Sequence, residues 1–125
     1  MKELVIKKCL KCGAIVKTIK DCQCSDCGIM CCDEPMKELK ANSVDASIEK
    51  HKPTYKIEND KLIVTVNHVM EEDHYIEWIC LLTDKKEEYV YLSPNDEAKA
   101  VFDALDSGTI YSYCNKHGLW KTDIE

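Results

Sequence analysis

The sequence has no long apolar run and no excess of positive charge. Within its 125 residues, no stretch approaches the roughly 18 consecutive apolar residues that a membrane-spanning helix needs. The formal net charge of −6 argues against a general nucleic-acid binder, because such proteins carry a basic surface that neutralises phosphates. Internal repeats and low-complexity tracts are also absent. We therefore expect a protein that binds neither a membrane nor nucleic acid.

The start of the chain, MKELVIKK, also lacks the apolar segment of a secretory signal peptide. Nine cysteines in such a chain do not suggest a disulfide framework, because disulfides form and persist in oxidising compartments. We interpret the cysteines instead as metal ligands in a reducing environment. A cytoplasmic location is the corresponding expectation.

The cysteines and histidines divide the chain. Seven of the nine cysteines fall between Cys9 and Cys32, whereas all four histidines lie at or beyond His51. A chain of this length holds one domain of about 85 to 90 residues with a small accessory module. We predict a cysteine-rich metal-binding module over residues 1–38 and a main domain over residues 39–125.

The first cysteine pair lies in the segment KCLKCG, which is typical of two thiolates on a tight turn. Gly13 directly after it supplies the backbone freedom that such a turn needs. A module this small buries too little apolar surface to be stable alone, so its fold is expected to depend on a bound metal.

The main domain shows the alternation of apolar and polar residues that is typical of strands. In one run, Leu62, Val64 and Val66 alternate with more polar positions, and Asn59–Asp60 before it predicts a hairpin turn. Short strands at this spacing favour an antiparallel β-sandwich. The predicted strands are residues 54–58, 61–69, 74–82 and 87–92.

One segment disagrees with the β pattern. Ser93 and Pro94 resemble a helix cap and first helical position, and apolar side chains at 98, 101, 102 and 105 then fall on one helical face. Local rules therefore favour a helix over residues 95–106.

The strongest functional signal is the set of four histidines together with one cysteine. Neutral imidazoles suit first-row metals, and a thiolate adds a soft, electron-donating ligand. Four nitrogens and one sulfur leave one coordination position of an octahedral metal open, which favours chemistry over scaffolding. Any one of these histidines alone would more often be a surface or core residue. The candidate ligands are His51, His68, His74, Cys114 and His117.

Three separated segments resemble one family: EKHKP at 49–53, HVMEEDHYIEW at 68–78 and YCNKHGLWK at 113–121. They are similar to the motifs of the superoxide reductases, the neelaredoxin and desulfoferrodoxin family. The resemblance implies an immunoglobulin-like antiparallel β-sandwich of seven strands, mainly β, in which 95–106 is not a regular helix. It also implies a mononuclear iron held by the four histidines and Cys114, which reduces superoxide by one electron to hydrogen peroxide.

The resemblance further assigns two catalytic roles. Lys50 corresponds to a lysine that attracts superoxide, and Glu49 to a glutamate that occupies the sixth position of the oxidised iron. Lys52, Lys116 and Lys121 lie beside other candidate ligands and would add to a positive funnel on a negative protein. Val69 departs from the family, whose members usually have proline there; the change removes some loop stiffness but no ligand.

The N-terminal module resembles desulforedoxin, whose four thiolates correspond to Cys9, Cys12, Cys31 and Cys32 and hold a rubredoxin-like iron. The segment DCQCSDCGIMCC is longer than in the family and adds three more thiols. A [4Fe–4S] cluster also takes four cysteines, so it stays an alternative to FeCys4, as does structural zinc. The possible alternative ligands are Cys22, Cys24 and Cys27.

Two other functions stay open at this stage. One is a structural or regulatory binding module that carries zinc; the other is an electron carrier whose second site is coordinatively closed. Cys80, within a strand-like run, is expected to be a buried and inert thiol. The family resemblance implies a small donor such as rubredoxin or a reductase, and a homodimer or tetramer.

Overall fold

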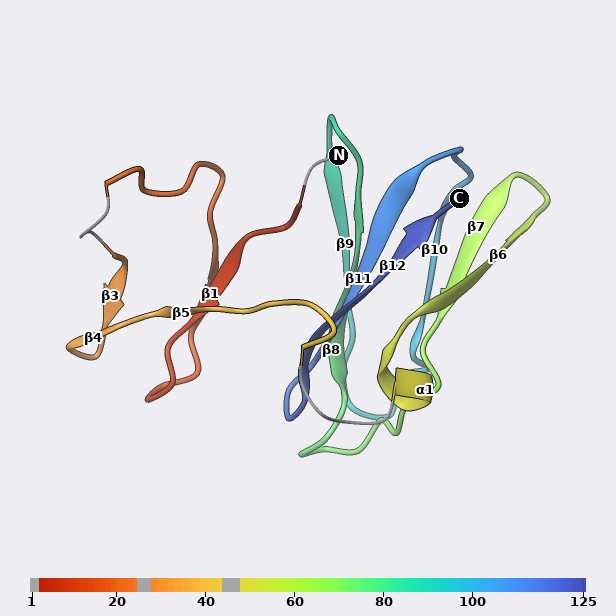
Figure 1. The fold of residues 1–125 in the computed structure, drawn as a ribbon. Coiled ribbons are helices and arrows are strands. Elements are labelled where there is room, and N and C mark those ends of the chain that lie inside the picture. The colour runs from red at the N-terminus through yellow and green to blue at the C-terminus, as the bar shows by residue number, and fades with distance from the viewer. Residues whose placement is uncertain (1–2, 25–27, 44–47) are drawn as a thin grey trace. The chain divides into compact units, whose positions relative to one another are not determined.

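The computed structural model describes residues 3–24, 28–43 and 48–125. The chain forms two compact units, Glu3–Lys40 and Ala41–Glu125, which Figure 1 shows as ribbons. Within the described ranges, no helix is long and apolar enough to cross a membrane.

The larger unit is a sandwich of two antiparallel sheets. A three-stranded sheet has the order β10-β7-β6, and a four-stranded sheet has the order β12-β11-β8-β9. A single helical turn, α1 (Ile48–His51), precedes the first of these strands (Figure 1). The strands are β6 (Thr54–Glu58), β7 (Lys61–Thr65), β8 (Ile76–Leu82), β9 (Glu87–Tyr91), β10 (Lys99–Asp103), β11 (Gly108–Cys114) and β12 (Gly118–Ile124). The predicted immunoglobulin-like, mainly β architecture is confirmed.

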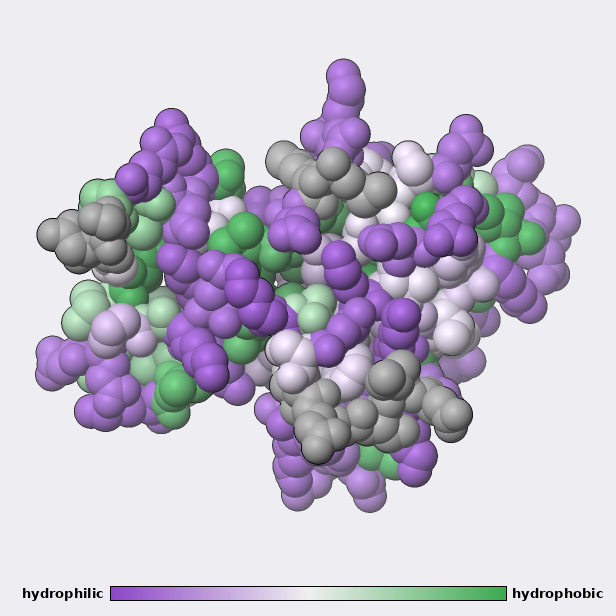
Figure 2. Space-filling model, viewed as in Figure 1, coloured by the Kyte–Doolittle hydropathy of each residue, from purple (hydrophilic) through white to green (hydrophobic). Residues whose placement is uncertain are grey.

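The core lies between the two sheets. Alternation in β7 buries Leu62 and Val64 completely, and residues from β8, β10 and β11 meet them from both sides. Burying one such aliphatic side chain contributes about 1.5–3 kcal/mol. Polar side chains dominate much of the surface seen in Figure 2. The buried cluster is Leu62, Val64, Val66, Ile76, Ile79, Leu81, Ala98, Ala100, Phe102, Ile110, Cys114 and Ile124.

The hairpin predicted at Asn59–Asp60 is present. Both residues have positive φ, 54° and 61°, and Glu58 pairs with Lys61 across a two-residue loop. This is the turn geometry whose twist matches that of the flanking strands. Asparagine and aspartate adopt it more readily than other non-glycine residues.

Two predicted strands are shorter than the sequence pattern indicated. β7 ends at Thr65 instead of residue 69, and β8 begins at Ile76 instead of residue 74. The residues between them form a loop, within which an isolated bridge pairs Glu71 with His74. His68 and His74 therefore lie on a loop, where their rings are not held perpendicular to a sheet.

Residues 95–106 are not a regular helix. Within them β10 pairs with β7 over five positions, from Lys99↔Thr65 to Asp103↔Lys61, and Ala100 and Phe102 alternate inward. The family-based expectation is confirmed, and the local helix pattern is wrong, because the period-2 burial in the sheet outweighs a weak helical preference.

The smaller unit consists of two small sheets. One has the order β2-β1-β5, and the other is a hairpin of β3 and β4. Among the described apolar residues of this unit only Leu4, Ile6 and Cys9 are buried. So small a core does not stabilise the unit alone. The strands are β1 (Ile6–Lys8), β2 (Ile15–Lys17), β3 (Met30–Cys31), β4 (Glu34–Pro35) and β5 (Lys37–Glu38).

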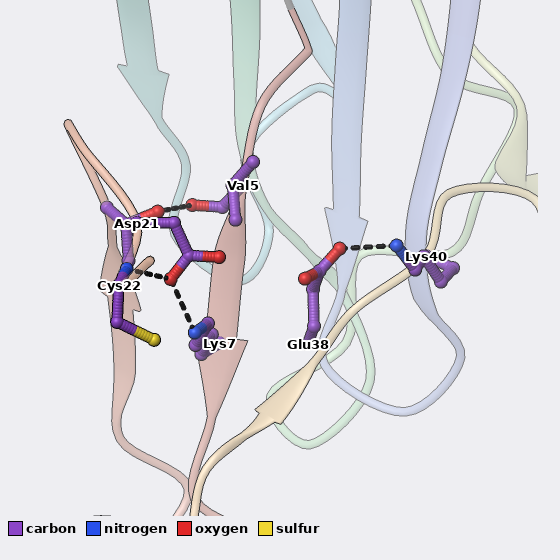
Figure 3. Close-up of polar contacts among 7 residues, drawn as sticks. Val5, Lys7, Asp21, Cys22, Glu38 and Lys40 are labelled. Carbon is purple, nitrogen blue, oxygen red and sulfur yellow. Dashed lines mark hydrogen bonds and ion pairs between the residues drawn. The ribbon is translucent and has the colours of Figure 1, made fainter. Parts of the chain in front are cut away.

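Polar contacts complement this core. The Lys7 ammonium lies 2.7 Å from Asp21 Oδ1, and the same oxygen accepts a hydrogen bond from the Cys22 N–H at 2.8 Å (Figure 3). The hydrogen bond to Lys7 holds the pKa of the Asp21 carboxyl below its usual value. Asp21 thus ties the start of the cysteine-rich loop to β1.

Candidate metal centres

The five candidate ligands of the larger unit lie at one end of its sandwich. His51 ends α1, His68 and His74 lie on the loop between β7 and β8, and Cys114 is the last residue of β11. His117 lies in the turn between β11 and β12. One nitrogen or sulfur atom of each lies within 4.8 Å of those of the other four. Residues that are up to 66 positions apart in the chain therefore form one cluster.

Distances between the donor atoms fit a shared metal ion. His51 Nε2 lies 2.9 Å from His117 Nδ1, and Cys114 Sγ lies 3.3 Å from His68 Nε2. Two nitrogens bound to one ion at about 2.1 Å, in perpendicular directions, lie about 3.0 Å apart. Neighbouring imidazole rings meet edge to face, with centroids 4.7–5.1 Å apart.

For His68 and His74, the hydrogen bonding of the ring indicates which nitrogen faces the ion. His68 Nδ1 donates to the Val69 carbonyl oxygen, which leaves Nε2 as an acceptor toward the cluster. Among the described residues, His74 Nε2 is a buried side-chain nitrogen without a hydrogen-bond partner. A buried polar atom of this kind requires an explanation, and a bound cation supplies one. Burial lowers the pKa of His68 and so favours the neutral imidazole that ligates metals.

Exposure differs across the cluster. Cys114 is fully buried and His51 is 4% exposed, whereas His68, His74 and His117 are partly exposed. The thiolate is therefore shielded from solvent, while the ring of imidazoles reaches the surface.

The backbone at the end of β11 turns the cysteine and its neighbours into the site. The register of β11 against β8 shifts between Tyr113 and Cys114, which is a local bulge. Gly118 then takes φ +84°, a conformation that favours glycine, and closes the turn that carries His117. Trp120, which is 1% exposed, stacks on the His51 ring with centroids 5.0 Å apart.

Sequence reasoning missed the polar residues that hold the ligand-bearing backbone. Buried Ser112 donates from Oγ to the His51 carbonyl at 3.0 Å, and Trp120 Nε1 donates to the His117 carbonyl at 3.1 Å. Thr122 Oγ1 donates to the Pro53 carbonyl at 2.6 Å. These hydrogen bonds satisfy the carbonyls of the two ligands His51 and His117 and of nearby Pro53. No local pattern distinguishes Ser112 and Thr122 from other strand residues, so only the fold identifies them.

Asn115 joins two ligand loops. Its Oδ1 accepts from the Tyr75 N–H at 3.0 Å, and its Nδ2 donates to the Asp73 carbonyl at 3.0 Å. His74 lies between these two residues, and Cys114 directly precedes Asn115. The sequence could have identified Asn115 as part of the site, because it lies between two candidate ligands in the segment CNKH.

The charged residues assigned to the site are only partly described. Lys50 is exposed at the end of α1, and Lys116 lies 3.9 Å from Asp73 in an exposed ion pair. Lys52 is exposed and Lys121 half-buried. The side chain of Glu49 falls outside the described part of the chain.

The second candidate centre lies in the smaller unit. The sulfurs of Cys9, Cys12, Cys31 and Cys32 all lie within 4.8 Å of one another. Cys12 and Cys31 have sulfurs 3.6 Å apart, and those of Cys31 and Cys32 are 3.9 Å apart. Four sulfurs bound tetrahedrally to one ion at about 2.3 Å lie about 3.8 Å from one another.

Backbone conformation brings adjacent cysteines to the same ion. Gly13 has φ +82°, as the sequence predicted, and the Gly13 N–H donates to the Cys9 carbonyl at 2.9 Å. Cys32 and Asp33 have φ of 52° and 62° and connect β3 to β4. Successive side chains of an extended strand point to opposite faces, so the turn at Cys32 is what lets two neighbouring sulfurs converge.

The pKa values of the thiols in this cluster also favour a bound cation. The Cys12 N–H donates to the Cys9 sulfur and lowers the pKa of Cys9 to about 6. The hydrogen bond to the Cys9 sulfur raises the pKa of Cys31 to about 12. One thiolate therefore disfavours the next, and a bound metal ion is what allows several to ionise together.

The three extra cysteines lie apart from this cluster where they are described. Cys22 is exposed and lies outside any disulfide, Cys24 is disulfide-bonded, and neither belongs to the four-sulfur group. Cys27 lies outside the described residues. Cys80 is fully buried in β8 and lies outside any disulfide.

Comparison with known proteins gives one family. Residues 43–123 match the family model described as desulfoferrodoxin. The desulfoferrodoxin of Syntrophotalea carbinolica is 39% identical over 126 residues, which cover 97% of each chain. A desulfoferrodoxin homolog of Archaeoglobus fulgidus is 38% identical over 121 residues, with 94% of each chain covered.

A solved structure agrees with these relatives. The superoxide reductase of Treponema pallidum superposes with a TM-score of 0.72 at 25% identity, over 97% of this chain and 99% of its own. The similarity therefore extends over both units. Together with the sandwich fold and the two clusters of potential ligands, these matches show that the chain belongs to the desulfoferrodoxin family.

Proposed function

We propose that this protein is a superoxide reductase, an oxidoreductase that adds one electron to superoxide and releases hydrogen peroxide. The observation that carries the proposal is the convergence of four imidazoles and one buried thiolate at the end of the sandwich. The printed function of a similar chain, the superoxide reductase of Treponema pallidum, supports it. Iron bound there supplies the electron and an open coordination position.

The donor set favours iron over zinc. Structural zinc sites are almost always four-coordinate and tetrahedral, whereas five donor atoms gather within 4.8 Å here. A mixture of imidazoles and one thiolate suits a redox-active first-row metal. We propose mononuclear iron, with His51, His68, His74, His117 and Cys114 as its ligands.

The protein residues divide the remaining tasks. Buried Cys114 holds negative charge on the side away from solvent, and the partly exposed histidines leave access from the other side. Lys50 attracts the superoxide anion to a chain whose net charge is −6. As the family resemblance implies, Glu49 would bind the iron once it is oxidised. An exposed site also favours release of peroxide before its O–O bond is cleaved.

In the N-terminal module we propose a mononuclear iron held by Cys9, Cys12, Cys31 and Cys32. The sulfur separations of 3.6 and 3.9 Å support one ion over a [4Fe–4S] cluster. In such a cluster each cysteine binds a different iron, so the sulfurs lie farther apart than on a shared ion. With Cys24 in a disulfide, that residue holds no metal in this state.

The wider biology follows as part of the same proposal. We assign residues 1–38 to the desulforedoxin-like module and 39–125 to the catalytic domain. The protein acts in the cytoplasm as a dimer or tetramer. A small electron-donor protein such as rubredoxin, or a reductase, restores the reduced iron.

The decisive experiment measures peroxide yield. Superoxide generated by pulse radiolysis is mixed with the reduced, iron-loaded protein, and hydrogen peroxide and oxygen are quantified. A reductase forms one peroxide for each superoxide and no oxygen, whereas dismutation forms one peroxide and one oxygen from two. A zinc-substituted preparation is the control. Oxygen release at half the superoxide consumed, or no reaction with the iron protein, would contradict the proposal.

A further inference from the structure

A row of aromatic rings crosses the four-stranded sheet on the face opposite Cys114. Tyr113 of β11 stacks on Trp78 of β8 with centroids 5.6 Å apart and planes 13° apart. Trp78 meets Tyr89 of β9 edge to face at 5.5 Å, and Tyr89 stacks on Tyr91 at 6.1 Å. These are the separations of rings in contact. Figure 1 shows the three strands side by side, in the order β11-β8-β9.

The two ends of this aromatic row differ in their surroundings. Tyr113 is 1% exposed and is joined by a peptide bond to Cys114, a candidate iron ligand. Tyr91 is 76% exposed on the edge strand. The row therefore leads from the bonded neighbour of the thiolate to solvent. Strand register fixes this course, because Tyr113 pairs with Trp78 and Trp78 with Tyr91.

The Tyr89 hydroxyl is hydrogen-bonded to a carboxylate that can accept its proton. Its hydroxyl donates to Glu87 Oε1 at 2.9 Å. Burial raises the pKa of Tyr89, so the ring is a neutral phenol at physiological pH. A phenol loses an electron far more readily when its proton can pass at once to a base. The hydrogen bond to Glu87 supplies that base and can return the proton afterwards.

Packing alone does not account for the whole row. The buried pair Trp78–Tyr113 is an ordinary cross-strand contact that stabilises a sheet. An edge-strand ring that is 76% exposed contributes little burial, and a tyrosine needs no carboxylate partner to pack. Continuity to the surface and a paired phenol are instead what an electron-transfer path requires.

We propose that Tyr113, Trp78, Tyr89 and Tyr91 form an oxidation-protection relay that carries an electron from the surface to the iron centre. The inference rests on the proposed function, because that activity produces hydrogen peroxide beside reduced iron. Peroxide that reacts there before it escapes would otherwise oxidise the ligands. The relay moves the oxidising equivalent to Tyr91, where small reductants in solution can remove it.

The reaction balances as follows. Hydrogen peroxide takes one electron from ferrous iron and one from Tyr91, its O–O bond breaks, and with two protons it becomes two molecules of water. Iron ends in the ferric state. Tyr91 loses its phenolic proton to water and becomes a neutral phenoxyl radical. Two such radicals on different molecules couple through a carbon–carbon bond to form dityrosine.

The test uses the whole iron-loaded chain, reduced and then mixed with hydrogen peroxide in the absence of oxygen. Freeze-quench EPR detects a tyrosyl radical, and dityrosine fluorescence with peptide mapping locates the crosslink. We expect a crosslink at Tyr91 in the wild type and none in zinc-substituted protein. A wild type without radical or crosslink would overturn the relay.

Three variants separate the relay from direct attack on an exposed ring. Y91F should lose the crosslink. W78F breaks the path on either route, because Trp78 lies opposite Tyr91 in the strand register as well as against Tyr89, and Tyr91 stays exposed, so the crosslink should also be lost. Y55F, a tyrosine on the other sheet, is the matched control and should crosslink like the wild type. A crosslink that persists in W78F would mean that peroxide or its products oxidise Tyr91 from solution, and the relay would be wrong.

The same preparations report on the proposed function independently. Visible absorption from the thiolate-bound iron must match the wild type in all three variants, which shows that the site is intact. Superoxide reduction is measured separately by pulse radiolysis. Loss of the crosslink in W78F together with failure of the wild type to reduce superoxide would reject the proposed function and keep the relay.

Discussion

Asn115 and Tyr75 are joined by two hydrogen bonds. The Tyr75 N–H donates to Asn115 Oδ1 at 3.0 Å, and the Asn115 N–H donates to the Tyr75 carbonyl at 3.3 Å. Through this pair, the loop that carries His74 is fixed to the turn that carries Cys114 and His117. The two ligand loops are thus joined by one backbone hydrogen bond and by the Asn115 amide side chain.

Replacing Asn115 with alanine should loosen the iron site. The Tyr75 N–H loses its acceptor, which costs about 1–3 kcal/mol where the group stays buried. Loss of a residue that orients a metal ligand typically lowers affinity by about 10–100-fold. Iron release to a chelator measures the effect, with circular dichroism to confirm folding. N115D retains Oδ1 and is the matched control, since it loses only the bond to the Asp73 carbonyl. Unchanged iron retention in N115A would show that the loops hold their positions without this side chain.

Replacing Cys114 with serine should remove the thiolate-to-iron absorption band and the reductase activity. A serine hydroxyl is a poor anionic ligand at neutral pH, whereas a thiolate binds metal directly. The N-terminal centre draws on other sulfurs and should keep its spectrum. Absorption spectroscopy and superoxide kinetics on the same sample test both statements. Retained activity would be incompatible with Cys114 as the iron's thiolate ligand.

Replacing Lys50 with alanine should slow the bimolecular reaction with superoxide. Exposed charges steer anions over a range that salt screens, so the variant's rate should also depend less on ionic strength. Pulse radiolysis at low and high salt measures both quantities. K85A is the control, because Lys85 is exposed in the turn between β8 and β9, at the opposite end of β8 from the site. If K50A and K85A change the rate equally, Lys50 acts only through net charge.

Replacing Cys12 with serine should abolish metal binding in the smaller unit, while Cys22→Ser should leave it intact. Cys12 belongs to the four-sulfur cluster, and exposed Cys22 does not. Metal and acid-labile sulfide analysis of the two variants gives the result. Loss of iron from C22S, or sulfide in the wild type, would favour a cluster in place of a single ion.

Chemistry-bearing residues were more predictable from the sequence than element boundaries. The chain has only four histidines, its cysteines gather in short motifs, and this spacing can be read without knowing the backbone. The strand pattern of Leu62 and Val64 was equally clear, because alternation reports burial directly. Residues 95–106 misled local rules because a short apolar period fits both a helix and a strand.

Supporting residues could not be predicted in the same way. Ser112 is a small polar residue in a buried strand, and its partner, the His51 carbonyl, lies 61 residues away. The register shift at Cys114 likewise depends on how β11 meets β8. Such contacts exist only after strands distant in sequence pair, so no local window contains them.

The span of the two clusters along the chain has a consequence for assembly. The five-donor site forms only when the 66 residues from His51 to His117 close into a loop. We therefore expect the sandwich to fold first and to bind iron at a preformed site. Cys9 and Cys12 are three residues apart, and a metal ion can bind them while the chain is still unfolded. Iron thus binds the larger unit after it has folded, whereas in the smaller unit metal binding starts folding. In a cell short of iron, we expect chains with a folded sandwich and an unfolded N-terminal module.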